Sequence, residues 1–182
     1  MVYAITLRRI INNFGTMRRA LRLSAPTMIQ VGDNLPECIL CEGTPGNKVN
    51  IRELCNKKKV IIFGLPGAFT PGCSRTHVPG YLKNYKLIRS KGVHLIICIS
   101  VNDAFVMEAW AKEQNTEGKI RMLADPDAAF TTAMNLHIEI PALGGIRSKR
   151  YSMVVDDNVV KKISIEPDGT GLSCTLAEKF LV

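Results

Sequence analysis

The sequence has few aromatic residues and no long uninterrupted apolar segment. Phenylalanine, tryptophan and tyrosine make up 6% of the 182 residues. No apolar run approaches the roughly 18–20 residues that a membrane-spanning helix needs, which excludes a transmembrane protein. Hydrophobic residues still amount to 46% and charged residues to 22%. This composition excludes a disordered chain and, at this length, fits one globular domain rather than two large ones.

Acidic residues are missing from the first 30 positions. That segment holds five arginines and no lysine, with apolar residues interspersed between them: Arg8, Arg9, Arg18, Arg19 and Arg22. The rest of the chain has 19 basic and 16 acidic residues, so most of the formal net charge of +8 lies in this segment. An arginine-rich, acid-free segment is typical of a mitochondrial transit peptide. We therefore predict a transit peptide over residues 1–25 and one domain over residues 26–182.

Other interpretations of the basic segment remain. It could be a basic surface arm, but a secretory signal would need an apolar core of about 7–15 residues, which Arg8 and Arg9 interrupt. Initiation at Met28 would give a cytosolic form of the same domain. A module that binds nucleic acid or an anionic membrane would need basic residues on a folded face with stacking aromatics. Neither partner is predicted, because the excess charge lies in the leader.

The pattern after Pro26 predicts an α/β domain, with a central mixed β-sheet flanked by helices. Residues 59–64 and 93–101 are nearly continuous apolar runs, as expected of central strands covered on both faces. Residues 73–90 repeat apolar positions at helical spacing, and Pro79 should bend that helix. Asp103 should open a second helix, and residues 122–124 should form another strand. Two further strands, 151–156 and 159–165, flank the hairpin turn signal Asp157-Asn158.

Four of the six cysteines are predicted to be packing residues. Cys38 and Cys41 form a C-x-x-C motif, but no second C-x-x-C or H-x-x-x-H completes a zinc site. Their surroundings look extended, and in a strand positions i and i+3 point to opposite sides. Cys55, near a predicted helix end, and Cys98, in an apolar strand, are expected to be buried thiols. We predict neither a metal site nor a disulfide scaffold.

Cys73 is placed differently, where a Gly/Pro-rich loop leaves a buried strand and the next helix begins. Free backbone N–H groups and the helix dipole favour a thiolate over a thiol at such a position. The thiolate is the nucleophilic form of cysteine. Thr70 can offer a hydroxyl, and the amides of Gly72 and Cys73 can bind a developing oxyanion. The loop is therefore the candidate active site.

Residues 66–74, Pro-Gly-Ala-Phe-Thr-Pro-Gly-Cys-Ser, resemble the peroxidatic-cysteine loop of peroxiredoxins, whose core pattern is Pro-x-x-x-Thr-x-x-Cys. Residues 100–105, 123–126, 150–155 and 166–174 resemble, in the same order, the atypical two-cysteine, peroxiredoxin-5 class. The resemblance runs from about Val31 to Leu176. It implies a thioredoxin-like fold, a noncovalent homodimer, and reduction of hydrogen peroxide, alkyl hydroperoxides and peroxynitrite without a cofactor.

The resemblance also implies residue roles. Cys73 would be the peroxidatic nucleophile, Pro66 would shield it from solvent, and Thr70 would hydrogen-bond the thiolate and the peroxide. Arg150 would stabilise the thiolate and the polarised O–O bond. Cys174 would resolve the Cys73 sulfenic acid as a disulfide, which thioredoxin would then reduce.

The choice of cation, the substrate preference and the roles of the histidines have alternatives. Spacing alone does not select Arg150 over Arg147 and Lys149, and residues 136–149 differ from the family's usual segment, which leaves substrate preference open. A thioredoxin-type disulfide reductase is disfavoured because the helix start, residues 73–76, lacks a second cysteine. His77, one turn past Cys73, and His94 suggest acid–base roles only weakly, and we expect His77 to be structural.

Overall fold

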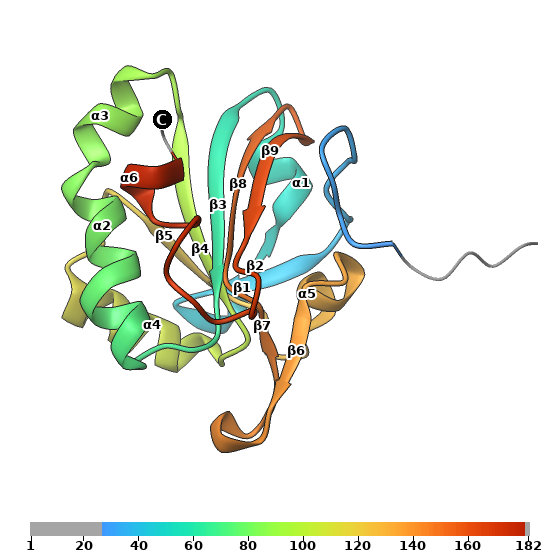
Figure 1. Ribbon diagram of the computed structural model, residues 1–182, viewed down its shortest axis with the longest axis vertical. Coiled ribbons are helices and arrows are strands. Elements are labelled where there is room, and N and C mark those ends of the chain that lie inside the picture. The colour runs from blue at the N-terminus through green and yellow to red at the C-terminus, as the bar shows by residue number, and fades with distance from the viewer. Residues whose placement is uncertain (1–26, 181–182) are drawn as a thin grey trace, which may run out of the picture.

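A seven-stranded mixed β-sheet runs through the middle of the computed structural model, which describes residues 27–180 (Figure 1). In spatial order its strands are β2 (Thr44–Asn50), β1 (Ile39–Glu42), β5 (Arg121–Ala124), β4 (Leu95–Ser100), β3 (Lys59–Leu65), β8 (Tyr151–Asp156) and β9 (Val159–Ile165). β3, β4 and β5 run parallel to each other, and the remaining neighbours pair antiparallel. The predicted mixed sheet is confirmed.

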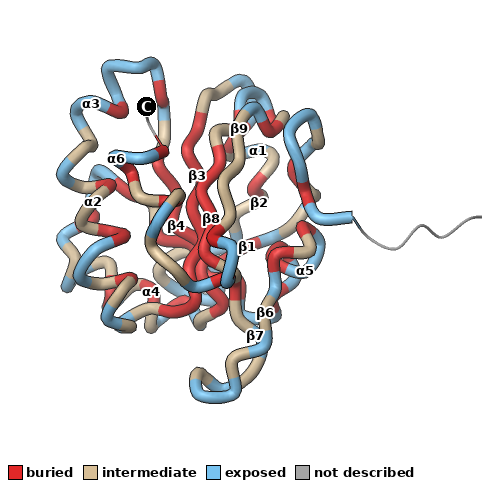
Figure 2. Tube along the Cα trace, viewed as in Figure 1, coloured by how far each residue is buried: buried red, intermediate tan, exposed pale blue. Residues whose placement is uncertain are grey.

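Helices cover both faces of this sheet. One face packs against α2 (Val78–Lys83), α3 (Tyr85–Ser90), α4 (Ala104–Gln114) and α6 (Ala177–Phe180), and the other against α1 (Ile51–Cys55) and α5 (Ala129–Ala133). Along β3, Ile61 and Phe63 join the first apolar cluster, while Val60 and Ile62 join the second. Successive side chains of a strand point to opposite faces, so a strand covered on both sides is apolar throughout. Figure 2 shows the resulting buried centre.

The predicted strands and the late hairpin are confirmed. β3, β4, β5, β8 and β9 lie where the apolar runs place them, with end shifts of a few residues. Asp157 and Asn158 turn between β8 and β9 with φ angles of 46° and 67°, as a two-residue hairpin requires. Asp103 caps α4, since its carboxylate accepts hydrogen bonds from the Phe105 and Val106 amides, each at 2.9 Å.

The single bent helix predicted for residues 73–90 is wrong in one respect, because the structure divides it. A π-helix, η1 (Cys73–His77), leads into α2, and a break at Asn84 separates α2 from α3. Pro79 has no amide to donate to the carbonyl of Arg75, so an α-helical ladder cannot run through this point. Instead the Val78 amide reaches back to the Cys73 carbonyl, which widens the turn that carries Cys73.

The packing role of the C-x-x-C cysteines is consistent with the structure. Cys41 lies in β1 within the apolar cluster that contains Ile61, whereas Cys38 packs against the cluster on the opposite face. Cys55 and Cys98 are fully buried, and burial raises the pKa of Cys55 to about 12. Among residues 27–180, no group of three His, Cys, Asp or Glu side chains is arranged to hold a metal ion.

Residues 136–149, the segment unlike the peroxiredoxin pattern, form a hairpin of their own. β6 (His137–Ile140) and β7 (Gly145–Ser148) pair around η2 (Pro141–Leu143) and protrude from the body of the molecule (Figure 1). Arg147 anchors the hairpin, since its Nη1 donates to the Val101 carbonyl at 2.7 Å. The predicted transit peptide lies outside the described residues. Within residues 27–180, the helices fall short of the length and apolarity needed to cross a bilayer.

Candidate active site

Cys73 is the first residue of η1 and follows the loop that leaves β3, an inner strand of the sheet. Its side chain is completely buried in the apolar cluster between β3 and the helices. β3 can pass this point only with glycine at position 64, because a Cβ there would lie 2.1 Å from the ring of Tyr151. The strand therefore delivers the loop of residues 66–72 to the start of η1, where backbone amides are free to face a ligand.

Hydrogen bonds fix this loop to the neighbouring elements. The Ala68 amide donates to the Asn102 side chain at 3.0 Å, and the Ser74 amide donates to the Thr70 carbonyl at 2.9 Å. The Thr70 hydroxyl donates to the Gly67 carbonyl at 2.9 Å. Phe69 has a φ of 60°, a conformation that bulky residues rarely adopt. The loop therefore has a defined shape, which it keeps at a cost in backbone strain.

Arg150 is the cation of the site. It precedes β8, is only 3% exposed, and its Nη1 donates to the Cys73 sulfur at 3.3 Å. Its Nε donates to the Thr170 carbonyl at 3.1 Å. None of the ion pairs found in residues 27–180 joins Arg150 to a carboxylate. The guanidinium therefore faces a sulfur rather than a carboxylate, and a cation in this position can stabilise the negative charge of a thiolate.

His77 extends this cluster toward the C-terminal segment. Its Nδ1 lies 3.2 Å from Arg150 Nη1, and its Nε2 lies 3.2 Å from the Thr175 carbonyl. Burial, then the charge of Arg150, lowers the pKa of His77 to about 3. The imidazole is therefore neutral: Nδ1 accepts from the guanidinium, which can only donate, and Nε2 donates to Thr175. This geometry supports the structural role expected for His77 and adds that it positions Arg150.

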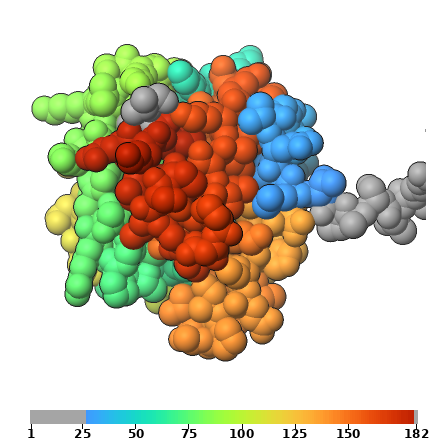
Figure 3. Space-filling view, viewed as in Figure 1, coloured from blue at the N-terminus to red at the C-terminus, as the bar shows by residue number. Residues whose placement is uncertain are grey.

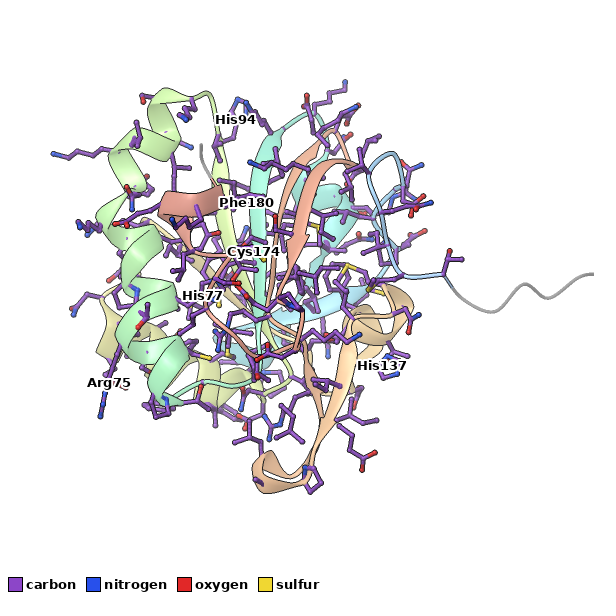
Figure 4. All side chains as sticks on the ribbon, viewed as in Figure 1. Arg75, His77, His94, His137, Cys174 and Phe180 are labelled. Atoms are coloured by element: carbon purple, nitrogen blue, oxygen red, sulfur yellow. The ribbon has the colours of Figure 1, made fainter. Side chains whose placement is uncertain are left out.

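Cys174 is half-buried in the segment between β9 and α6. It precedes Thr175, whose carbonyl contacts His77, and Figure 4 shows His77 and Cys174 near each other. Its thiol donates to the Ile165 carbonyl at 3.4 Å, and its amide donates to the Glu166 carboxylate at 3.0 Å. Both Cys73 and Cys174 are free thiols in this structure. In Figure 3 the red surface of the C-terminal residues after β9 lies between the green surface of the helices and the orange surface of the late strands.

Three of the predicted site residues, Cys73, Arg150 and Gly72, lie together. Arg150 Nη1 contacts the Cys73 sulfur, and a Cβ on Gly72 would lie 3.4 Å from Arg150 Nη2. Pro66 is buried at the base of the loop. The Thr70 hydroxyl donates to the Gly67 carbonyl and not to the Cys73 sulfur.

Glu166 was not predicted as a site residue from the sequence. It begins the motif of residues 166–174, and its carboxylate accepts hydrogen bonds from the amides of Ser173, Cys174 and Thr175.

Comparisons with known proteins agree with this geometry. The model of the redoxin family matches residues 30–179. The chloroplastic peroxiredoxin-2E of Arabidopsis thaliana is 39% identical over 169 residues, which cover 89% of this chain and 72% of that protein.

Two solved structures extend the comparison. Reduced Prx3 of Vibrio vulnificus in complex with hydrogen peroxide is 43% identical, with a TM-score of 0.80 and coverage of 85% of this chain and 98% of that one. Peroxiredoxin 5 of Alvinella pompejana is 44% identical, with a TM-score of 0.73 and coverage of 80% and 95%. The predicted thioredoxin-like fold is thereby confirmed. With the redoxin match spanning most of its length, the chain belongs to the redoxin family and is a peroxiredoxin, a thiol-dependent peroxidase.

Proposed function

We propose that Cys73 is the peroxidatic nucleophile and that it reduces hydrogen peroxide, alkyl hydroperoxides and peroxynitrite. The contact of 3.3 Å between the Arg150 guanidinium and the Cys73 sulfur is the observation that carries this proposal. A buried cation against a buried sulfur favours the thiolate, which is the form that attacks peroxide oxygen. The reductant that restores the enzyme is thioredoxin.

In the first step the Cys73 thiolate attacks one peroxide oxygen. The S–O bond forms as the O–O bond breaks. The departing oxygen takes a proton and leaves as water or an alcohol, and with peroxynitrite the leaving group is nitrite. Arg150 and the amides of Gly72 and Cys73 face the charge that develops on oxygen. The Thr70 hydroxyl, which donates to Gly67, keeps lone pairs with which to orient a peroxide O–H. Buried Pro66 keeps water away from the sulfur.

In the second step Cys174 resolves the sulfenic acid. Its sulfur attacks the Cys73 sulfur, the S–O bond breaks, and the hydroxyl leaves as water with the proton of the attacking thiol. The two thiols have different partners before reaction, Arg150 for Cys73 and Ile165 for Cys174. Local unwinding of η1, with movement of the Cys174 segment, therefore precedes disulfide formation.

We expect the full-length protein to consume peroxide with NADPH, thioredoxin and thioredoxin reductase. After one equivalent of hydrogen peroxide, non-reducing peptide mass spectrometry should show a Cys73–Cys174 disulfide in protein of monomer mass. A disulfide between chains would contradict resolution within one chain. If only Cys73 sulfenic acid accumulates and an external thiol restores it, the enzyme works with one cysteine and Cys174 is not its resolving residue.

Assembly and location are a separate proposal, a noncovalent homodimer imported into mitochondria. The acid-free, arginine-rich leader supports import, and the exposed rings of Phe69, in the Cys73 loop, and Phe105, in α4, offer apolar surface for a second chain. Native mass spectrometry of the protein isolated from mitochondria should find a dimer whose chains begin near residues 24–30. A monomer, or chains that begin at Met1, would contradict it. Because peroxiredoxin-2E of Arabidopsis thaliana is chloroplastic, recovery from plastids would replace the mitochondrial location.

A further inference from the structure

The segment that carries Cys174 is held by a single buried carboxylate. Glu166, 2% exposed, accepts five hydrogen bonds from three consecutive residues. Its Oε1 accepts from the amides of Ser173, Cys174 and Thr175 at 2.9, 3.0 and 3.0 Å, and from the Thr175 hydroxyl at 2.7 Å. Its Oε2 accepts from the Ser173 hydroxyl at 2.6 Å. The backbone amides of residues 173–175 are thus all bound to one charged group, the Glu166 carboxylate.

The same segment is held from its other side through the Thr175 carbonyl. This oxygen lies within hydrogen-bond distance of three donors, at 3.2 Å from His77 Nε2, 3.0 Å from Tyr81 Oη and 2.9 Å from Ser152 Oγ. Figure 4 shows His77, the last residue of η1, beside the segment that holds Cys174. Movement of Cys174 toward Cys73 therefore requires that contacts to Glu166, and in part to Thr175, be broken.

Glu166 also acts on the Cys174 thiol through its charge. Burial, followed by the negative charge of Glu166, raises the pKa of Cys174. Burial alone would raise the pKa of Glu166, but the hydrogen bonds from Ser173 and Thr175 outweigh it and lower the pKa to about 2. Glu166 is therefore ionised throughout the physiological range. A protonated thiol is a poor nucleophile, so the carboxylate both holds Cys174 in place and keeps its sulfur less reactive.

We propose that Glu166 is a positioning residue that slows disulfide formation by holding the Cys174 segment in its reduced-state position. The proposal rests on the function assigned to Cys174 above. Hydrogen bonds to a charged acceptor are about twice as strong as neutral ones. Opening five of them, even partly, sets a barrier before Cys174 can reach the Cys73 sulfenic acid. Once released, the segment stays tethered near the site by β9 and by buried Ala177 in α6.

The barrier decides how long the sulfenic acid persists. During that time a second peroxide can transfer an oxygen to the Cys73 sulfenic acid, which becomes sulfinic acid as the peroxide is reduced to water or an alcohol. Disulfide formation releases water and ends this exposure. A slower resolution step therefore makes the enzyme more sensitive to excess peroxide. A weaker hold by Glu166 should make it more resistant.

The test is Glu166→Gln, which keeps the length of the side chain and an acceptor oxygen but removes the charge. The chain's one tryptophan supplies the signal, because Trp110 Nε1 donates to the hydroxyl of Ser74, next to Cys73, at 3.0 Å. Stopped-flow fluorescence resolves oxidation and then disulfide formation in the same trace. We expect the second phase to be about fivefold to tenfold faster in Glu166→Gln than in the wild type, the scale of one or two weakened charged hydrogen bonds. The sulfinic acid fraction after a 100-fold peroxide excess should fall in step.

Ser173→Ala is the second variant, since it removes one hydroxyl contact to Glu166 and leaves the charge. A smaller acceleration in the same direction is expected, and it decides the matter if Glu166→Gln does not fold. Ordinary structural damage would slow resolution and increase sulfinic acid, the opposite pattern. A second phase as slow as in the wild type, or slower, in folded variants overturns the role of Glu166 alone. Absence of the Cys73–Cys174 disulfide in the wild type overturns this proposal together with the role of Cys174.

Discussion

Replacement of Cys73 by serine is expected to reduce peroxide turnover to the uncatalysed background while the fold remains intact. A serine hydroxyl at this position stays protonated near neutral pH, even beside a cation. Serine also has no sulfur, so it cannot form the sulfenic acid intermediate of the reaction. The side chain changes little in volume, so the buried cluster between β3 and the helices should still form. Thioredoxin-coupled NADPH oxidation measures turnover, and thermal unfolding followed by circular dichroism reports the fold.

Cys98 provides a matched control. It is buried in the same apolar cluster as Cys73 but lies on β4. Burial and then the neighbouring Cys73 raise the pKa of Cys98 well above its usual value, which leaves a protonated thiol. Cys98→Ala should therefore keep most of the activity, with a modest loss of stability from the small cavity. Activity in Cys73→Ser together with its loss in Cys98→Ala would reverse the assignment.

Local patterns predicted most of the central sheet from the sequence alone. β3 and β4 are covered on both faces, so each gives a continuous apolar run that is hard to mistake. The division of residues 73–90 was not foreseen, because the effect of Pro79 depends on which carbonyl the preceding amide, that of Val78, can reach. The shape of residues 136–149 was also not predicted. That hairpin is held by Arg147 at Val101, a contact between residues 46 positions apart.

The site was predicted by residue type, but its connections were not. A Pro/Gly loop ending in a cysteine indicates a nucleophile by itself, whereas spacing could not choose among the three basic residues near position 150. The structure makes that choice by turning Arg150 inward and Arg147 toward the hairpin. The Glu166 carboxylate binds three backbone amides, and Thr175 accepts through its carbonyl. Backbone atoms carry no residue-specific pattern. Contacts of this kind become visible only once the chain is folded.

Arg150→Met should lower the second-order rate constant for peroxide reduction by about 10²–10³-fold, the usual effect of removing one donor that faces a developing negative charge. Methionine fills similar space but carries no charge and donates no hydrogen bond. The substitution therefore removes both the counter-charge of the Cys73 sulfur and a donor to the departing oxygen. Arg150→Lys keeps the charge but loses the planar, multiply donating head, so an intermediate loss of about tenfold is expected.

The pH dependence separates the two contributions of Arg150. Any thiol gives more thiolate as the pH rises, so the help of a cation matters most at low pH, whereas a donor to the departing oxygen acts at every pH. The loss in Arg150→Met should therefore be larger at pH 6 than at pH 9, and the part that remains at pH 9 belongs to the transition state. Lys149→Met, which removes a neighbouring positive charge, should stay within about threefold of the wild type, as expected for a partly exposed charge screened by solvent. Rates in Arg150→Met that match the wild type at both pH values would show that the contact at 3.3 Å has no part in the chemistry, and the nucleophile would then depend on the helix start and Thr70 alone.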